Sequence, residues 1–381
     1  MSNFIILGSR NYANRRLLYE FRRNGYDAII LNPLRLLPFV NDKVGDRMYV
    51  ANDTSHEPTR IYKNSVWGIV PRIGYDLQFF SKSVEHLNKN MGIPSTATAD
   101  ALLNAQDKIR TLQLLSQNGI KTPKTVAIKQ AHNLQWTIDQ LGGFPIVAKL
   151  IYGSRGIGVF ILTEPLSAST ALDAFSSQGH SLLLQQFIET AKNDKKKHDY
   201  RVVVVDGQCV AAIKRNSVGE DFRTNASIKE DCEGVEVSEL PEGMAEIAVK
   251  SANAVSLEIA GIDLAVDVDT KEIYVYEVNG NMNFKSTEKF SQKNVARHIV
   301  DYSMRKAGVA PQNEISASIP NFNKDKEGIP FLSVLEGADF LVDESFDLEC
   351  SAKTIRASFI KSAQYLEMNG FDTFLTDTKI M

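Results

Sequence analysis

Short apolar runs alternate with an amphipathic segment over the first part of the chain. The runs FIILG (4–8), DAIIL (27–31) and VWGIVPRIG (66–74) have the length and β-branched content of buried strands. Between the first two, RRLLYEFRRNG carries apolar residues at helical spacing and ends at Gly25. Because strands that alternate with helices favour a parallel α/β sheet, we predict such a domain for residues 1–95.

A longer amphipathic pattern follows these strands. The segment GIPSTATADALLNAQDKIRTLQLLSQNGIKTP has apolar residues at helical spacing between Pro94 and the stop signal Asn118-Gly119. The pattern predicts one long helix. A helix of this length after a set of short strands indicates that a second unit, residues 96–187, begins here.

The next unit, residues 188–308, is rich in strand patterns. Its segment YRVVVVDGQCVAAIKR (200–215) predicts a hairpin that turns at Asp206-Gly207. Beyond it, residues 309–381 begin with a Pro/Asn/Ser-rich linker and contain one helical stripe, formed by Ile355, Phe359, Ala363 and Leu366. We treat this last part as a C-terminal extension that acts as a lid, as a subunit contact or as a recruiting element for an acceptor.

Two strand patterns around DTK bring acidic residues opposite one another. If the three-residue turn of GIDLAVDVDTKEIYVYEVN (261–279) is centred on Thr270, Asp263 lies directly across from Glu277, and Asn279 shares their face. Opposed carboxylates repel, whereas a bound cation makes the same arrangement favourable. Oxygen ligands without histidine or cysteine suit Mg²⁺ or Mn²⁺. A merely solvated polar face is the alternative that this segment leaves open.

A glycine-rich turn joins two further strand patterns. In GGFPIVAKLIYGSRGIGVFIL (142–162), Gly153, Gly156 and Gly158 let backbone N–H groups approach an anion, and Lys149 on the preceding strand can reach a phosphate. Walker A and Rossmann loops open a helix, but here an apolar strand follows. We therefore expect a hairpin loop that folds over phosphates, with a plain β-hairpin turn as the alternative.

Composition narrows the class of protein. The 381 residues include 43 basic and 46 acidic side chains, a formal charge of -3, so the total charge predicts no nucleic-acid partner. The three cysteines, Cys209, Cys232 and Cys350, have neither disulfide-framework nor zinc-ligand spacing. The chain shows no signal peptide and no apolar stretch long enough for a bilayer, so we expect a cytoplasmic protein without a membrane partner.

Eight motifs follow one another along the chain in a set order. They are PRIG (71–74), NAQDKIRTLQLLSQNGIKTP (104–123), VAKLIYGSRGIGV (147–159), LLLQQFIE (182–189), DYRVVVV (199–205), AAIKRNSVGEDFRTN (211–225), AGIDLAVD (260–267) and YEVNGN (276–281). The series resembles the ATP-grasp ligases of the RimK-like glutamate ligase family over roughly residues 1–308.

That resemblance implies a fold and an activity. The fold is an ATP-grasp fold that combines α/β and α+β parts, with an N-terminal parallel α/β (pre-ATP-grasp) domain and a C-terminal extension. ATP is then held between two α+β lobes. A carboxylate attacks the γ-phosphate to give an acyl phosphate, and an amine displaces phosphate to form an amide.

The resemblance also implies the residues that hold the nucleotide. Lys108 and Lys149 are similar to lysines that contact the phosphates. The phosphate-covering loop contains Gly153, Ser154, Gly156 and Gly158. The hinge that contacts adenine contains Gln186, Phe187 and Ile188, where Phe187 supplies the apolar contact and backbone groups of the other two read the base. Asp199 is similar to the acidic residue on the ribose side.

Metal-binding and catalytic residues are implied in the same way. Asp263, Glu277 and Asn279 match the magnesium triad, which the hairpin pattern gives independently, and two ions are expected. The residues that resemble those holding the transferring phosphate and the acyl intermediate are Lys214, Arg215, Arg223 and Asn225. Planar guanidinium groups suit two-point contact with phosphate or carboxylate, although surface ion pairs are the alternative for both arginines.

The substrate side departs from the family pattern. After EVN the family continues with a small-Pro-Gly loop, whereas this chain has GNMNFKSTEKFS. Arg72 and Lys285 are the residues we expect at the substrate, with Lys289 as the other candidate for its carboxylate and a solvated side chain as the alternative for either lysine. We predict the substrates to be an amino acid plus a carboxylate-bearing small molecule, peptide or protein. A homo-oligomer is a further possibility. A kinase-like phosphotransferase and a non-catalytic nucleotide-binding regulator are the alternatives to a ligase.

Overall fold

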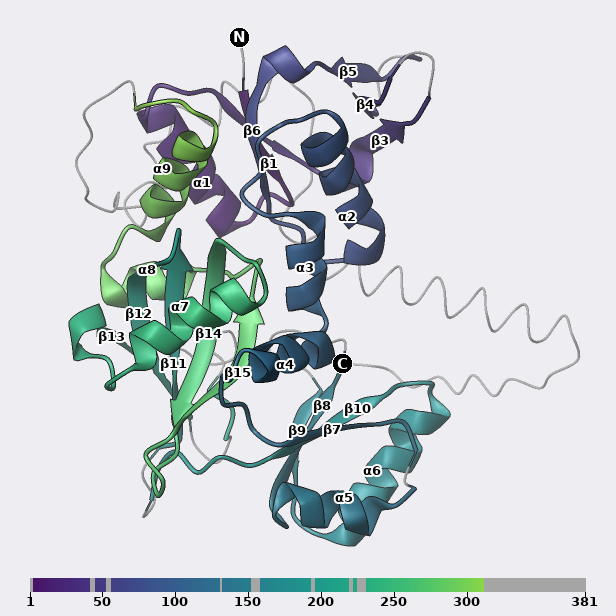
Figure 1. Ribbon diagram of the computed structural model, residues 1–381, viewed down its shortest axis with the longest axis vertical. Helices are drawn as coiled ribbons and strands as arrows, with labels where there is room; N and C mark the ends of the chain where they lie inside the picture. Colours follow the sequence, from purple (N-terminus) through teal and green to yellow (C-terminus); the bar gives the residue numbers. More distant parts are fainter. Residues whose placement is uncertain are drawn as a thin grey trace, which may run out of the picture. The chain divides into compact units, whose positions relative to one another are not determined.

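The computed structural model describes residues 3–41, 45–52, 56–130, 132–151, 158–192, 196–218, 222–224 and 231–311 (Figure 1). Spatial proximity divides the chain into residues 1–319 and 320–381, and every element below belongs to the first of these units. The helical stripe predicted between Ile355 and Leu366 lies outside the described residues. No helix within the described ranges is long and apolar enough to cross a membrane.

The predicted N-terminal parallel sheet is confirmed. Strand β1 (Asn3–Leu7) lies between β2 (Ala28–Leu31) and β6 (Val66–Pro71), and both neighbours run parallel to it. Helix α1 (Tyr12–Arg23) connects β1 to β2. The chain therefore leaves β1 toward β2 on one side and returns beside β1 as β6 on the other side.

An antiparallel sheet that the sequence analysis does not predict is inserted between β2 and β6. It has the order β3 (Leu36–Phe39), β4 (Arg47–Val50) and β5 (Thr59–Ile61), and each strand has only three or four residues. Strands this short carry too few residues for alternation to be visible. Around it lie the short helices η1 (Pro33–Arg35), η2 (Lys63–Ser65), α2 (Leu77–Glu85) and η3 (His86–Asn90).

The prediction of a single long helix after Pro94 is wrong. The structure has two helices, α3 (Ala99–Gln106) and α4 (Lys108–Gln117), because Asp107 takes an extended conformation between them. The Asp107 side chain accepts hydrogen bonds from the backbone N–H groups of Ile109 and Arg110, at 2.9 and 3.0 Å. Aspartate is a strong N-cap residue, so it begins a new helix here, with Lys108 as its first residue.

A four-stranded antiparallel sheet follows. Its order is β7 (Thr125–Ile128), β10 (Leu182–Gln186), β8 (Ile146–Leu150) and β9 (Val159–Leu162). One face is covered by α5 (Leu134–Leu141) and α6 (Pro165–Ser177), whose apolar residues form a core with every second residue of the strands (Figure 1). The strand expected after the glycine-rich loop is confirmed as β9, which pairs with β8.

The largest sheet is antiparallel and has five strands. Its order is β13 (Cys232–Val235), β12 (Gln208–Asn216), β11 (His198–Val205), β14 (Ile259–Val266) and β15 (Ile273–Asn279). The predicted hairpin turn at Asp206-Gly207 is confirmed, with φ of 52° and 71° at these two residues. Helix α7 (Met244–Ala254) packs against this sheet, and the short helix η4 (Val237–Glu239) precedes it.

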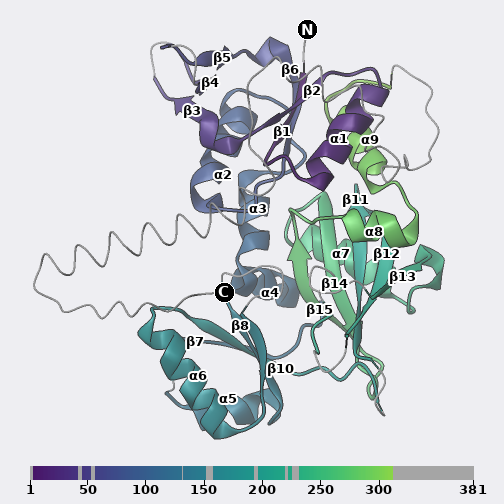
Figure 2. The same ribbon diagram turned by 180° about the vertical axis from the view of Figure 1, so that it is seen from behind.

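The last two helices return the chain to the first sheet. After α8 (Lys285–Ser291), helix α9 (Val295–Lys306) packs beside α1, as Figure 2 shows, and also contacts β6. Side chains from α9 and from the first sheet share one core, in which Phe4, Phe21 and Ile299 are fully buried. The segment 188–308 therefore does not form a core of its own.

A buried polar cluster joins α1 to α8 and α9. The Arg16 side chain donates to Glu288 at 3.0 and 3.3 Å, to Glu20 at 3.0 Å and to Asn294 at 2.8 Å. The Tyr12 hydroxyl also donates to Glu288, at 2.9 Å. Because Arg16, Glu20 and Glu288 are at most 1% exposed, the two carboxylates depend on the one guanidinium between them, and not on water, for compensation of their charge.

Candidate active site

The predicted pairing of Asp263 with Glu277 is confirmed, although the turn differs from the expected one. Near the turn Val266 pairs with Ile273, so the loop has an even number of residues and is not centred on Thr270. A bulge then inserts Tyr276 between the paired positions and restores the alignment of Asp263 with Glu277.

Two arginines hold Asp263. Arg201 on β11 donates from Nε and Nη2 to the two carboxylate oxygens of Asp263, at 2.8 and 2.7 Å. Arg215 on β12 donates to both oxygens of Asp199, at 2.7 and 2.5 Å, and its Nη2 lies 3.2 Å from Asp263 Oδ2. Four charged side chains on three neighbouring strands therefore form one cluster.

The protonation of this cluster follows from its contacts. Burial acts to raise the pKa of Asp263, but the charges and hydrogen bonds of Arg201 and Arg215 hold that pKa below its usual value. Burial acts to lower the pKa of Arg215, yet Asp199 and Asp263 raise it above its usual value. Asp263 and Arg215 are therefore both charged at neutral pH.

Two lysines from the preceding unit reach the same place. Lys108, the first residue of α4, has its Nζ 3.7 Å from Glu277 Oε1. Lys149 on β8 donates to Gln185 Oε1 at 2.6 Å, and its Nζ lies 5.4 Å from the centre of the Tyr276 ring. Burial lowers the pKa of Lys149 to about 8, against the opposing charge of Glu277. The site is thus built from two different sheets and one helix terminus.

The third member of the predicted triad, Asn279, pairs across the ladder with Gly261. Its Nδ2 atom is buried and has no hydrogen-bond partner among the described residues, so no protein contact fixes the orientation of the amide. Within the described ranges no three His, Cys, Asp or Glu side chains form a metal-binding group. The donor set is instead two carboxylates and one amide, whose hard oxygens fit Mg²⁺.

The predicted hinge residues follow β10. The backbone N–H of Gln186 already donates to the carbonyl of Lys124 at 2.8 Å, so this N–H is engaged and does not face a base. Ile188 is buried. The half-buried ring of Phe187 has Lys197 Nζ 5.5 Å from its centre and the ring of Phe222 at 6.5 Å.

Part of the predicted phosphate-covering loop and one catalytic candidate lie outside the described residues: Gly153, Ser154, Gly156 and Asn225. Gly158 is described and has a φ of 74°. A Cβ atom there would lie 2.5 Å from Leu150 Cδ1, so the loop re-enters β9 through a position that only glycine fills without strain. Arg223 belongs to the described residues 222–224 and follows Phe222, the neighbour of the hinge ring.

Lys214 does not join the cluster. Side chains alternate along a strand, so Lys214 faces the side of β12 opposite to Arg215. Its ladder partners are Tyr200 and Glu233. The expectation that Lys214 lies with Arg215 at the transferring phosphate is therefore not supported by the strand register.

The two predicted substrate residues both adjoin loop 280–284. Arg72 follows β6, is 4% exposed, and donates to the Met282 carbonyl and, at 3.4 Å, to Asn14 Oδ1. Its Nη1 atom has no hydrogen-bond partner among the described residues. Lys285 is exposed at the start of α8, with its Nζ 5.9 Å from the centre of the Tyr12 ring.

The sequence analysis missed three residues of the site: Arg201, Tyr276 and Gln185. A signal existed for Arg201, because it lies two positions after Asp199 on one strand and therefore shares its face. Tyr276 and Gln185 gave no such signal. The bulge that places Tyr276 and the ladder that brings Gln185 next to Lys149 are features of pairing between strands, not of one strand.

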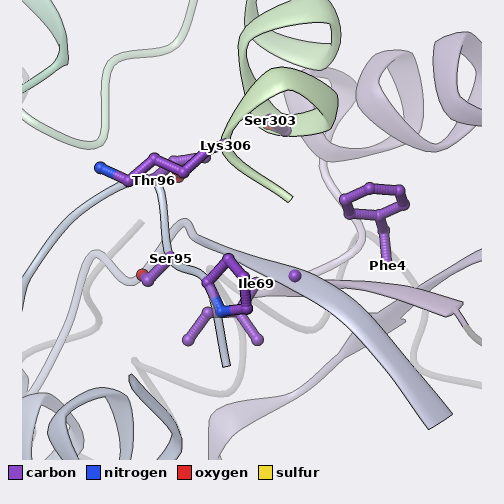
Figure 3. A pocket seen from close by; sticks show the side chains of 8 residues that line it. Phe4, Ile69, Ser95, Thr96, Ser303 and Lys306 are labelled. Atoms are coloured by element: carbon purple, nitrogen blue, oxygen red, sulfur yellow. The ribbon is translucent and has the colours of Figure 1, made fainter. Parts of the chain in front are cut away.

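Two hollows lie outside the charged cluster. A small one, lined by Phe4, Ile69, Ser95, Thr96, Ser303 and Lys306 among others, has no room even for a water molecule (Figure 3). A larger one of about 620 Å³ lies between α4 and β7 and includes Leu183. Leu183 is the ladder partner of Lys149, so this hollow opens on the sheet face that carries Lys149.

Comparison with known proteins identifies the family. The family model of the RimK-like ATP-grasp domain matches residues 105–303. A probable alpha-L-glutamate ligase of Syntrophotalea carbinolica is 33% identical over 304 residues, which cover 77% of this chain and 93% of that protein. Another, from Aeromonas salmonicida, is 30% identical over 302 residues, which cover 78% and 94%.

Solved structures share the fold. ATP-grasp ligase PsnB, complexed with a minimal precursor, Mg and ADP, superposes with a TM-score of 0.60 at 16% identity, over 80% of this chain and 98% of that one. D-alanine–D-alanine ligase from Bacillus anthracis, complexed with ATP, gives 0.55 at 15% identity, over 81% and 98%. The predicted fold and resemblance are confirmed: this chain is an ATP-dependent carboxylate-amine ligase that belongs to the RimK-like ATP-grasp family.

Proposed function

We propose that this ligase adds a glutamate-like amino acid to a small molecule, peptide or protein through an acyl-phosphate intermediate. One observation carries the proposal. Glu277 on β15 lies opposite Asp263 on β14 and also within 3.7 Å of Lys108 from the preceding unit. Carboxylates for a metal and cations for phosphates therefore meet at one point, as phosphoryl transfer requires.

The nucleotide is proposed to lie between the two larger sheets. Lys108 and Lys149 would contact its phosphates, and the glycine loop that ends at Gly158 would cover them. Adenine would lie near the hinge at Phe187, where the Gln186 carbonyl and backbone groups of Ile188 would read the base, because the Gln186 N–H is engaged. Asp199, which Arg215 holds by two hydrogen bonds, would face the ribose side.

Asp263, Glu277 and Asn279 would hold the Mg²⁺ ions, of which we propose two, with Mn²⁺ as a substitute. When bound, such ions neutralise the charge of the phosphate oxygens on both sides of the displacement. The oxygen-only donor set and the amide of Asn279, whose nitrogen has no partner among the described residues, support this assignment.

The proposed reaction has two steps. A substrate carboxylate oxygen attacks the γ-phosphorus, the bond to the bridging oxygen breaks, and ADP leaves. The amine nitrogen then attacks the acyl carbon, phosphate leaves, and the nitrogen loses a proton. No side-chain nucleophile is needed, so the protein's part is positioning and countercharge, which we assign to Arg215, Arg223 and Asn225.

Loop 280–284 is proposed to select the substrate. Arg72 is too buried to touch a substrate and would act by holding the Met282 carbonyl, whereas exposed Lys285 would receive a substrate carboxylate. The relatives named probable alpha-L-glutamate ligases support glutamate as the amino acid. PsnB and the macrocyclase MdnC, both bound to precursor peptides in their structures, support a peptide acceptor.

The test combines ATP, Mg²⁺, pools of amino acids and candidate acceptors, and measures phosphate release together with product mass. The expected product is an acceptor heavier by one or more amino acids less water, formed with ADP and phosphate. Asp263→Asn and Glu277→Gln should each abolish release, whereas Asp206→Asn, at the exposed hairpin turn, should not. A stable phosphorylated product without an amide, or full activity in both site variants, would contradict the proposal.

A further inference from the structure

Arg201 binds the carboxylate of Asp263, which the proposed function assigns as a metal ligand. Its Nε and Nη2 atoms donate to the two different oxygens of Asp263, at 2.8 and 2.7 Å. The two residues are also direct ladder partners on β11 and β14. Both oxygens of Asp263 therefore already have a cationic partner.

Arg215, the second arginine of the cluster, has a different main partner. Arg215 makes its two short hydrogen bonds to Asp199 and only a longer contact, 3.2 Å, to Asp263. If Asp263 turned toward a metal ion, Arg215 would keep its main partner. Within the described part of the chain, both hydrogen bonds of Arg201 are to Asp263, so Arg201 would lose both.

Cations already match the carboxylates around the triad without any metal. Arg201 and Arg215 match Asp199 and Asp263, Lys108 lies 3.7 Å from Glu277, and Lys149 adds a further cation. A divalent ion that arrives alone therefore enters a region with no net negative charge. The phosphates of a nucleotide change this, because they attract the ion and also offer a released guanidinium a two-point partner.

Resting on the proposed function, we propose that Arg201 is an internal counter-ion: it holds Asp263 while the site lacks nucleotide, and it exchanges Asp263 for the phosphates when a metal–nucleotide complex binds. Free metal is then kept off the triad. Arg201 is a positioning residue for Asp263 before this exchange and a phosphate-binding residue after it.

The test measures Mn²⁺ binding by electron paramagnetic resonance, first with the metal alone and then with a non-hydrolysable ATP analogue. Removing the competing cation in Arg201→Gln should tighten binding of Mn²⁺ alone by about tenfold, within the usual range of coupling between sites. The same change should weaken binding of the analogue. A purely structural role for Arg201 predicts the opposite sign for the metal, because a disordered site loses affinity.

Two further variants complete the design. Arg305→Gln, which breaks the exposed pair with Asp206 at the far end of β11, should leave Mn²⁺ binding unchanged. Arg201→Lys keeps the charge but not the two-point contact, so its Mn²⁺ affinity should lie between those of the wild type and Arg201→Gln. Circular dichroism shows whether Arg201→Gln folds. If it does not, Arg201→Lys tests the proposal in its place.

The outcomes separate this inference from the proposed function. If the Arg201 variants bind Mn²⁺ alone no more tightly than the wild type, while Asp263→Asn loses the Mn²⁺ that the wild type binds with the analogue, the counter-ion role is overturned and the metal site stands. If Asp263→Asn binds Mn²⁺ with the analogue as the wild type does, the metal assignment itself is wrong.

Discussion

Replacing Arg16 by methionine is expected to lower the free energy of unfolding by about 3–5 kcal/mol, because among the described residues it leaves the buried Glu288 carboxylate without a cation and Glu20 with only the longer contact from Arg23. Arg16 is the only side chain of the cluster described above that carries positive charge and contacts both Glu20 and Glu288. Methionine retains most of the apolar volume of arginine, so the loss measured is chiefly electrostatic. Glu288 keeps its hydrogen bonds from the Tyr12 hydroxyl and the Ala296 N–H, which soften the effect without removing it.

The expected change in melting temperature follows from the size of the protein. An unfolding entropy of about 2.1 cal/mol/K per residue gives roughly 0.6 kcal/mol/K for the roughly 300 residues that the structure describes, so Tm should fall by about 5–8 °C. Urea unfolding and scanning calorimetry measure the two quantities. Arg23→Met is the matched control: Arg23 also contacts Glu20, at 3.5 Å, but is 22% exposed, so the loss should stay below about 1 kcal/mol.

Adding Glu288→Gln to the Arg16→Met variant should recover part of the loss, since a neutral amide costs less to bury than a carboxylate. The reasoning is refuted if Arg16→Met and Arg23→Met unfold at the same urea concentration, or if the second substitution lowers stability further.

Two other predictions concern the nucleotide. Because burial lowers the pKa of Lys149 to about 8 and phosphates would raise it, ATP binding at pH 8.5 should take up protons, up to about 0.75 per site. Calorimetry in two buffers of different ionisation enthalpy measures the uptake; Lys149→Met should abolish it, and heats independent of buffer would contradict it. Gly158→Ala should raise the KM for ATP several-fold, because its Cβ would meet Leu150 at a φ of 74°. Gly142→Ala is the control: its φ is 95°, but nothing lies within 4 Å, so it should lower Tm and leave KM unchanged.

The parts of the fold that sequence predicts well are those with a strong local pattern. The N-terminal strands β1, β2 and β6 are apolar and β-branched, and Asp206-Gly207 marks its hairpin directly. The break at Asp107 was missed because its helical neighbours have continuous apolar spacing, and one capping side chain outweighs that spacing.

The predicted pairing at the candidate site is correct partly by chance. The pairing of Asp263 with Glu277 was deduced from a turn of odd length, but the turn is even and the bulge adds the missing residue. Lys214 shows the converse. Lys214 is adjacent to Arg215 in sequence but faces the other side of the strand. The pairing of Arg215 with Asp199 across the ladder decides which of the two faces the site.

The bulge at Tyr276 also acts as a phase shift along β15. Val275 and Val278 both enter the core beneath α7, although strict alternation would send residues three apart to opposite faces. If Tyr276 were an ordinary ladder residue and not a bulge, the alternation that buries Val275 would turn the Glu277 carboxylate into that same core. One inserted residue therefore lets strand β15 meet two requirements. Val275 and Val278 both pack in the hydrophobic core, and Glu277 between them faces Asp263 at the site. Deleting Tyr276 would leave Val275, Glu277 and Val278 in regular alternation, so the Glu277 carboxylate would keep its face and the site would lose the ring beside Lys149.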